Sequence, residues 1–120
     1  MANNVLIVED NALFISIYKV IFEGIDCEVT FVNNARDAQN FSERKQPNLI
    51  VLDLHLSDGS GEEVLSTLRQ IESMRTTPII IVSTSARREE EKLRAAGATA
   101  ILPKPIHIDS FTNLVHQYLN

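Results

Sequence analysis

Three short apolar runs constrain the fold of this chain more than any other feature. They are Val5–Val8, Leu49–Leu52 and Ile79–Val82. Each run is too short for a helix and too continuous for a strand with one wet face, so each predicts an interior strand of a parallel sheet covered on both sides. Two weaker runs, Cys27–Phe31 and Thr99–Leu102, are typical of outer strands. The sequence therefore predicts five strands.

Segments of helical character follow these strands in regular alternation, over residues 11–23, 35–45, 61–73, 86–96 and 108–119. Polar residues that could cap the helices precede or open them: Asp10 or Asn11, Asn33 or Asn34, Ser60, Ser85 and Asp109. Five strand–helix units joined by right-handed crossovers form an open sheet with helices on both faces. The predicted fold is a doubly wound α/β structure.

Length, charge and cysteine content bound the classes of function. The 120 residues suit one domain, so we expect a single domain spanning 1–120 with no effector domain. The single cysteine, Cys27, excludes an internal disulfide and a cysteine-based zinc site. No apolar run is long enough to enter a membrane, so we expect a cytoplasmic location. A net charge of −5 with scattered basic residues argues against direct contact with nucleic acid.

Polar residues follow the predicted strands at the edge where such sheets bind ligands. Glu9 and Asp10 follow the first strand, Asp53 the third, Ser83 the fourth and Lys104 the fifth. Three neighbouring carboxylates need a cation, and an all-oxygen ligand set favours Mg²⁺. Asp53 could then attack a phosphoryl group, while Lys104 and Ser83 contact the phosphoryl oxygens.

Each of these residues also has an ordinary structural interpretation. The acidic pair could cap the first helix and complement its dipole. Asp53 could be a turn residue before the stretch SDGSG, Lys104 a solvated loop lysine, and Ser83 a turn former. Their coincidence at four strand ends favours the site.

Four motifs in this order and spacing resemble the receiver domain of two-component response regulators over essentially all 120 residues. They are VLIVEDN, LIVLDLHLSDGSG, PIIIVST and ILPKP. The resemblance implies a flavodoxin-like (βα)5 fold with strand order 2-1-3-4-5. It also implies that Asp53 accepts a phosphoryl group from a phosphohistidine on a sensor histidine kinase or a histidine phosphotransfer protein. The output would then be contact with a downstream protein.

The resemblance assigns roles to the remaining site residues. Asp10, Asp53 and the backbone carbonyl of His55 would ligate Mg²⁺, and Glu9 would act through a metal-bound water. Ser83 and Lys104 would contact the phosphoryl group. The Lys104–Pro105 peptide is expected to be cis. The imidazole of His55 is expected to point to solvent.

Several positions depart from the family pattern, and the candidates for switching are Thr84, Ser85 and Ile101. Thr84 stands where Ala or Gly is usual, and its branched side chain is expected to narrow access to the acceptor and slow the loss of phosphate. Ile101 stands where Tyr or Phe is common, so output is expected to depend on movement of the loop around Ser83, Thr84 and Ser85. Glu9 replaces the commoner Asp and keeps the charge.

The first helix carries an apolar arc about twice as wide as the ~100° stripe that packing on one side requires. The last helix could cover the surplus with Phe111, Leu114, Val115 and Leu119. Alternatively, part of the arc docks the helical bundle of the phosphodonor. The candidate docking contacts are Asn11, Phe14, Ile17, Pro105 and Ile106.

Two other functions stay open at this point. One is a Mg²⁺-dependent phosphatase or phosphotransferase that uses an aspartyl phosphate on a small substrate. Such enzymes usually carry an acid two positions after the nucleophile, where this chain has His55, and a cap domain. The other is a degenerate receiver that only binds, although Asp53 and Lys104 are both present.

Overall fold

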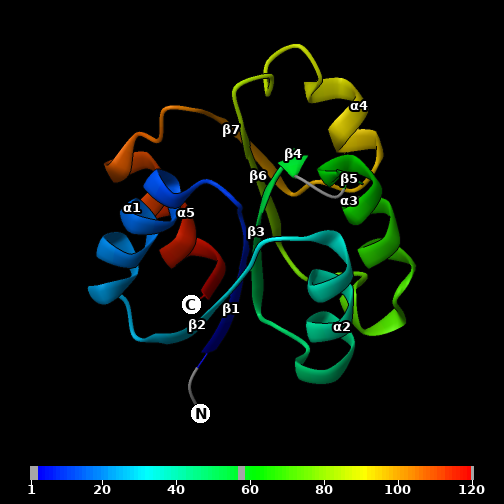
Figure 1. The fold of residues 1–120 in the computed structure, drawn as a ribbon, viewed down its shortest axis with the longest axis horizontal. Coiled ribbons are helices and arrows are strands. Elements are labelled where there is room, and N and C mark those ends of the chain that lie inside the picture. The colour runs from blue at the N-terminus through cyan, green and yellow to red at the C-terminus, as the bar shows by residue number, and fades with distance from the viewer. Residues whose placement is uncertain (1–2, 57–58, 120) are drawn as a thin grey trace.

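The computed structural model describes residues 3–56 and 59–119, whose central feature is one five-stranded parallel sheet (Figure 1). Its strands are β1 (Asn3–Val8), β2 (Cys27–Val32), β3 (Leu49–Asp53), β6 (Ile79–Ser83) and β7 (Ala100–Pro103). They lie in the order β2-β1-β3-β6-β7, which confirms the predicted order 2-1-3-4-5. A small hairpin of β4 (His55–Leu56) and β5 (Gly59–Ser60) was not predicted, because two-residue strands leave no periodicity to detect.

Five helices and one short 3-10 helix connect the strands. They are α1 (Ala12–Glu23), α2 (Ala35–Lys45), α3 (Gly61–Gln70), η1 (Glu72–Met74), α4 (Glu90–Ala95) and α5 (Ile108–Leu119). The side chain of Asn11 caps α1 by accepting hydrogen bonds from the backbone N–H groups of Leu13 and Phe14, and Asn34 caps α2. Within the described residues, none of these helices combines the length and the apolar character that crossing a bilayer requires.

Some predicted helix boundaries are wrong. The predicted helix over 86–96 begins only at Glu90, because Ser83 and Ser85 accept backbone hydrogen bonds in a turn that precedes it. Ser85 is therefore not a helix cap. Asp109 lies inside the first turn of α5, which begins at Ile108, and α3 ends at Gln70, short of the predicted residue 73. The side chain of Ser60 lies outside the described part of the chain.

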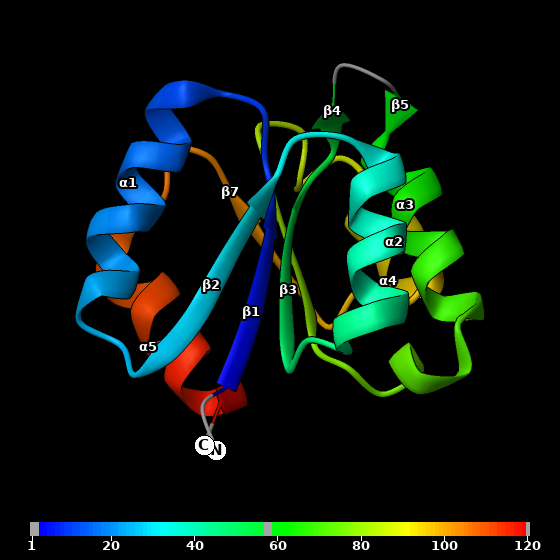
Figure 2. The same ribbon diagram turned by 60° about the horizontal axis from the view of Figure 1, so that its bottom comes forward.

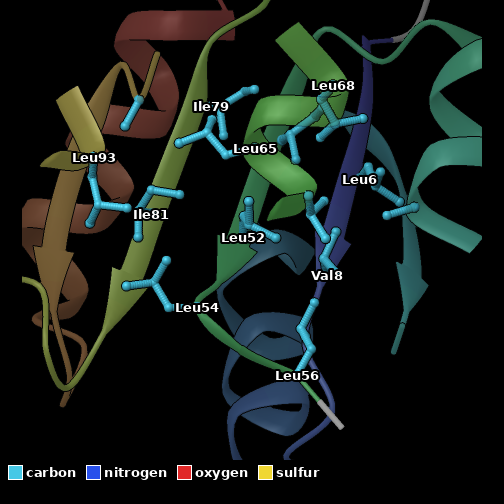
Figure 3. Packing of buried hydrophobic residues seen from close by; sticks show 14 of the residues in the cluster. Leu6, Val8, Leu52, Leu54, Leu56, Leu65, Leu68, Ile79, Ile81 and Leu93 are labelled. Carbon is cyan, nitrogen blue, oxygen red and sulfur yellow. The ribbon is translucent and has the colours of Figure 1, made fainter. Parts of the chain in front are cut away.

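Helices cover both faces of the sheet, as the continuous apolar strands predict. Figure 2 shows α1 and α5 on one face and α2, α3 and α4 on the other. Alternate residues of β1 point to opposite faces: Leu6 and Val8 join the cluster under α2, α3 and α4 (Figure 3), and Val5 and Ile7 join the cluster under α1 and α5. All four side chains are fully buried. A polar residue at any of these positions would lose its water, which explains the unbroken run.

The apolar arc of α1 is only partly covered by α5. The ring of Phe111 lies 5.5 Å from that of Tyr18 and 6.0 Å from that of Phe22, so α5 does supply the expected packing. Leu13 and Val20 nevertheless remain 66% and 70% exposed. Intramolecular packing therefore explains one side of the arc and leaves another side open to solvent.

Candidate functional site

The strand register brings the predicted site residues to one edge of the sheet. Val8 pairs with Leu52, and Asp53 pairs with Val82. The residues that follow β1 therefore lie beside the end of β3. One carboxylate oxygen from each of Glu9, Asp10 and Asp53 lies within 4.8 Å of the other two. The three acids form one cluster, which we call the acid cluster.

Lys104, which follows β7, places its ammonium against the acid cluster. Its ammonium donates a hydrogen bond of 2.9 Å to Glu9 Oε1 and lies 3.5 Å from Asp53 Oδ1. The side chains of Lys104, Glu9 and Asp53 are only 8%, 1% and 5% exposed. Charges this well buried are tolerated when they are paired, and removing either partner of such a pair is strongly destabilising. The ammonium also lies 3.9 Å from the centre of the Phe14 ring.

Burial also raises the pKa of the Glu9 carboxyl, and its hydrogen bond from Lys104 offsets part of that rise. The second oxygen of Glu9 accepts a hydrogen bond of 3.1 Å from the backbone N–H of Asn11. Glu9 therefore faces inward, while Asn11 caps the helix. Burial also raises the pKa of the Tyr18 hydroxyl, and the nearby charges of Glu9 and Asp53 add to this rise.

The donor set of the acid cluster fits Mg²⁺. Its three carboxylates supply the hard oxygen ligands that this ion prefers. Asp53 Oδ1 is buried and accepts no hydrogen bond within the described part of the chain, although Lys104 lies near it. A buried acceptor of this kind is costly unless something binds it. The role of the His55 carbonyl stays a prediction.

A chain of hydroxyl groups leads away from Ser83 on the other side of Asp53. Ser83 Oγ lies 3.1 Å from Ser85 Oγ and accepts a hydrogen bond from the Ser85 backbone N–H at 3.2 Å. Ser85 Oγ in turn donates to Glu89 Oε2 at 2.7 Å. His55 is exposed, as predicted, but its Nε2 lies 3.3 Å from Ser85 Oγ, so its imidazole does more than face solvent.

Two residues of the site escaped sequence reasoning. Gly61 packs so closely under Asp53 that a Cβ there would lie 2.6 Å from Leu54 Cα and 3.0 Å from the carbonyl carbon of Asp53. Gly61, the second glycine in SDGSG, was a detectable signal, but the stretch indicated only a turn. Glu89 lies in a charged run that is typical of a solvated surface, so nothing in the sequence separated it from its neighbours.

The predicted docking residues surround the acid cluster unevenly. Asn11 and Pro105 are exposed, and the Lys104–Pro105 peptide is cis as expected. Ile17 and Ile106 are half-buried and pack against the core under α1 and α5. Phe14 is half-buried and turns its ring toward Lys104. The five residues thus differ in how much surface they offer a partner.

The predicted switch residues have different surroundings. Thr84 is exposed, while Ser85 is buried within the hydroxyl chain. Ile101, in the edge strand β7, is half-buried against the core under α2, α3 and α4. The effects predicted for Thr84 and Ile101 stay predictions.

Comparison with known proteins agrees with this geometry. The family model described as the response regulator receiver domain matches residues 5–116. The chain therefore belongs to the response regulator receiver domain family, whose members are signalling modules that bind Mg²⁺ in an acidic site and interact with histidine kinases and downstream targets.

Individual relatives match nearly the whole chain. The polar-differentiation response regulator DivK of Brucella anthropi is 32% identical over 120 residues, which cover 99% of this chain and 98% of the relative. A signal receiver domain from Vibrio parahaemolyticus is 34% identical with a TM-score of 0.91, covering 99% of this chain and 91% of that one.

A more distant structure shows the fold alone. The receiver domain of the sensor histidine kinase PA1611 from Pseudomonas aeruginosa has a TM-score of 0.88 at 22% identity, covering 99% of this chain and 98% of that one. That structure holds a magnesium ion in its active site cleft.

Proposed function

We propose that this protein is a phosphoacceptor in a two-component phosphorelay, in which Asp53 takes a phosphoryl group from a phosphohistidine. The donor is a sensor histidine kinase or a histidine phosphotransfer protein. The observation that carries the proposal is the buried Asp53 carboxylate at the centre of the acid cluster, with one oxygen free of hydrogen bonds and Lys104 beside it. A nucleophile needs a free lone pair, and Oδ1 of this carboxylate offers one.

In the proposed transfer, a carboxylate oxygen of Asp53 forms a bond to phosphorus as the phosphorus–nitrogen bond to imidazole breaks. The electron pair of the broken bond stays on the imidazole nitrogen. Lys104, now shared between Glu9 and Asp53, pairs with a phosphoryl oxygen. When held by Asp10, Asp53 and the His55 carbonyl, with Glu9 acting through a metal-bound water, Mg²⁺ would offset the negative charge that builds up there.

Ser83 is the proposed link between phosphorylation and output. Because Ser85 Oγ donates its proton to Glu89, the Ser83 hydroxyl donates to Ser85 Oγ at 3.1 Å, and donating to a phosphoryl oxygen on Asp53 instead requires that contact to break. Movement of Ser83 would shift the turn that contains Thr84 and Ser85. With Ile101 in place of an aromatic ring, we propose that this turn carries the signal to a downstream protein.

Acetyl phosphate with Mg²⁺ tests the proposal through the intact mass of the protein. We expect wild type to gain one phosphoryl group, and we expect Asp53→Asn or chelation of the metal to abolish the gain. Turnover of small phosphate esters without a labelled protein would support the phosphatase, and no reaction would support a module that only binds. Either outcome would overturn the proposed function. A receiver of this kind is expected to catalyse only its own phosphorylation and dephosphorylation.

Docking of the phosphodonor is proposed at the N-terminal part of α1 and the loop after Lys104. This surface lies beside the acid cluster, so a donor bound there could reach Asp53. The test is the ratio of the transfer rate from a phosphohistidine protein to that from acetyl phosphate. We expect Ile17→Glu to lower this ratio at least tenfold, because acetyl phosphate needs no docking surface. An unchanged ratio would contradict docking at this surface.

A further inference from the structure

Phe14 is a predicted docking residue whose side chain contacts a residue of the site, Lys104. Its ring centre lies 3.9 Å from the Lys104 ammonium, well inside the ~6 Å range of a cation–π contact. The ring belongs to α1 and the ammonium follows β7, so the contact joins two elements that are far apart in sequence. We propose that Phe14 is a positioning residue that holds the Lys104 ammonium where an incoming phosphoryl group needs it. This inference rests on the proposed function.

Three neighbours fix the position of the ammonium. Glu9 Oε1 accepts its hydrogen bond at 2.9 Å, Asp53 Oδ1 lies 3.5 Å away, and the Phe14 ring closes a further side. The aromatic face attracts the cation without offering a lone pair that would compete with the carboxylates or with a phosphoryl oxygen. An acceptor side chain in place of the ring would pull the ammonium away from Asp53.

The contact matters because lysine is a flexible side chain. Its four-carbon stem has many rotamers, and confining it before the reaction removes an ordering cost from the transfer step. The Lys104 side chain is only 8% exposed, and cation–π contacts are strongest when the cation has lost water. Within the described residues, Lys104 is also the one cation that forms an ion pair with the acid cluster. No other cation among the described residues could therefore take over the role of Lys104 if its ammonium were misplaced.

The test compares labelling of Asp53 by acetyl phosphate in variants of Phe14. We expect Phe14→Leu, which stays apolar but lacks the ring, to lower the rate about three- to thirty-fold, as the strength of cation–π contacts implies. Phe14→Tyr and Phe14→Trp should recover most of the rate. Leu13→Ala is the matched control on the same turn, because Leu13 is 66% exposed, and it should label at the wild-type rate.

Fluorination separates the charge of the ring from its packing. Replacing Phe14 by 3,5-difluoro- and then 3,4,5-trifluorophenylalanine keeps the size of the ring but weakens its negative face. The labelling rate should fall stepwise with the number of fluorines. A purely structural ring would give no such series. These variants also keep the test valid if Phe14→Leu folds poorly.

A spectroscopic measurement is independent of phosphorylation. The ring should shift the Lys104 ε-methylene protons upfield, and Phe14→Leu should remove this shift while Phe14→Tyr keeps it. The positioning role alone would be overturned if wild type labels normally and the labelling rates of Phe14→Leu and the trifluoro variant lie within twofold of the wild-type rate. Wild type that does not label at all would overturn the proposed function and the positioning role together.

Discussion

Arg69 on α3 joins three backbone segments away from the site, so its replacement tests how the fold is stabilised there. Its guanidinium donates to Gly97 O at 2.8 and 2.9 Å, to Met74 O at 2.6 Å and to Thr77 O at 2.7 Å. These carbonyls belong to η1 and to the segments that lead into β6 and β7. Burial lowers the pKa of the guanidinium, whose hydrogen-bond acceptors within the described chain are backbone carbonyls and the Thr99 hydroxyl. Arg69 therefore stabilises the fold by pairing backbone carbonyls rather than through an ion pair.

Replacing Arg69 by Met should cost about 3 to 5 kcal/mol of the free energy of unfolding. A hydrogen bond from a charged donor contributes about 1.5 to 3 kcal/mol, and such bonds on one group are not additive. With a urea m-value of about 2 kcal/mol/M, the midpoint of unfolding should fall by about 2 M. Arg69→Lys should lie between Met and wild type, because one ammonium cannot span carbonyls on both sides of the guanidinium.

The assay is urea unfolding followed by circular dichroism, with Arg94→Met as the matched control. Arg94 lies within α4, and both side chains of its ion pair with Glu90 are 52% exposed, so its loss should change stability by less than about 0.5 kcal/mol. The argument is refuted if Arg69→Met unfolds within about 1 kcal/mol of wild type, or if Arg94→Met loses as much.

The remaining predictions concern Gly61, Ser42 and Cys27. Gly61→Ala places a Cβ against the backbone of Asp53, so it should destabilise the fold by about 1 to 3 kcal/mol and slow acetyl phosphate labelling. Its control is Gly24→Ala, whose Cβ would meet only Ile21 O at 3.9 Å. Equal behaviour of the two variants would contradict the argument. Ser42 Oγ is buried and has no hydrogen-bond partner among residues 3–56 and 59–119, so Ser42→Ala should leave urea stability unchanged or raise it by up to about 1 kcal/mol, and a clear loss would mean that the hydroxyl has a partner. Burial, and then the charge of Asp26, raise the pKa of Cys27 above its ordinary value of 9.0, so the folded chain keeps this proton longer than the unfolded chain and stability falls as pH rises above about 9. The pH profile of iodoacetamide labelling should therefore have its midpoint above 9.0, and a midpoint at or below that value would count against the shift.

The sequence alone determined the layers of the fold and which residues gather at the site. Uninterrupted apolar runs can only be strands covered on both faces, since a wet face would demand alternating polar residues. Helices with clear caps, such as those of Asn11 and Asn34, were placed within one residue. Because parallel strands deliver their ends to one edge, the order of motifs was enough to predict that Glu9, Asp53 and Lys104 would meet.

Only the tertiary structure decided the contacts between side chains that are distant in sequence. The start of α4 was misplaced because the carbonyls of Ser83 and Ser85 accept hydrogen bonds that hold a turn there, against the helical character of the segment. The Ser85 hydroxyl, which donates a hydrogen bond to the Glu89 carboxylate, linked Glu89 to the site. Phe14 changed from a surface contact to the neighbour of Lys104, since the distance between a ring on α1 and an ammonium after β7 depends on how helix and sheet pack. Periodicity reports which face of an element is buried, but it carries no information about which residue of another element lies against it.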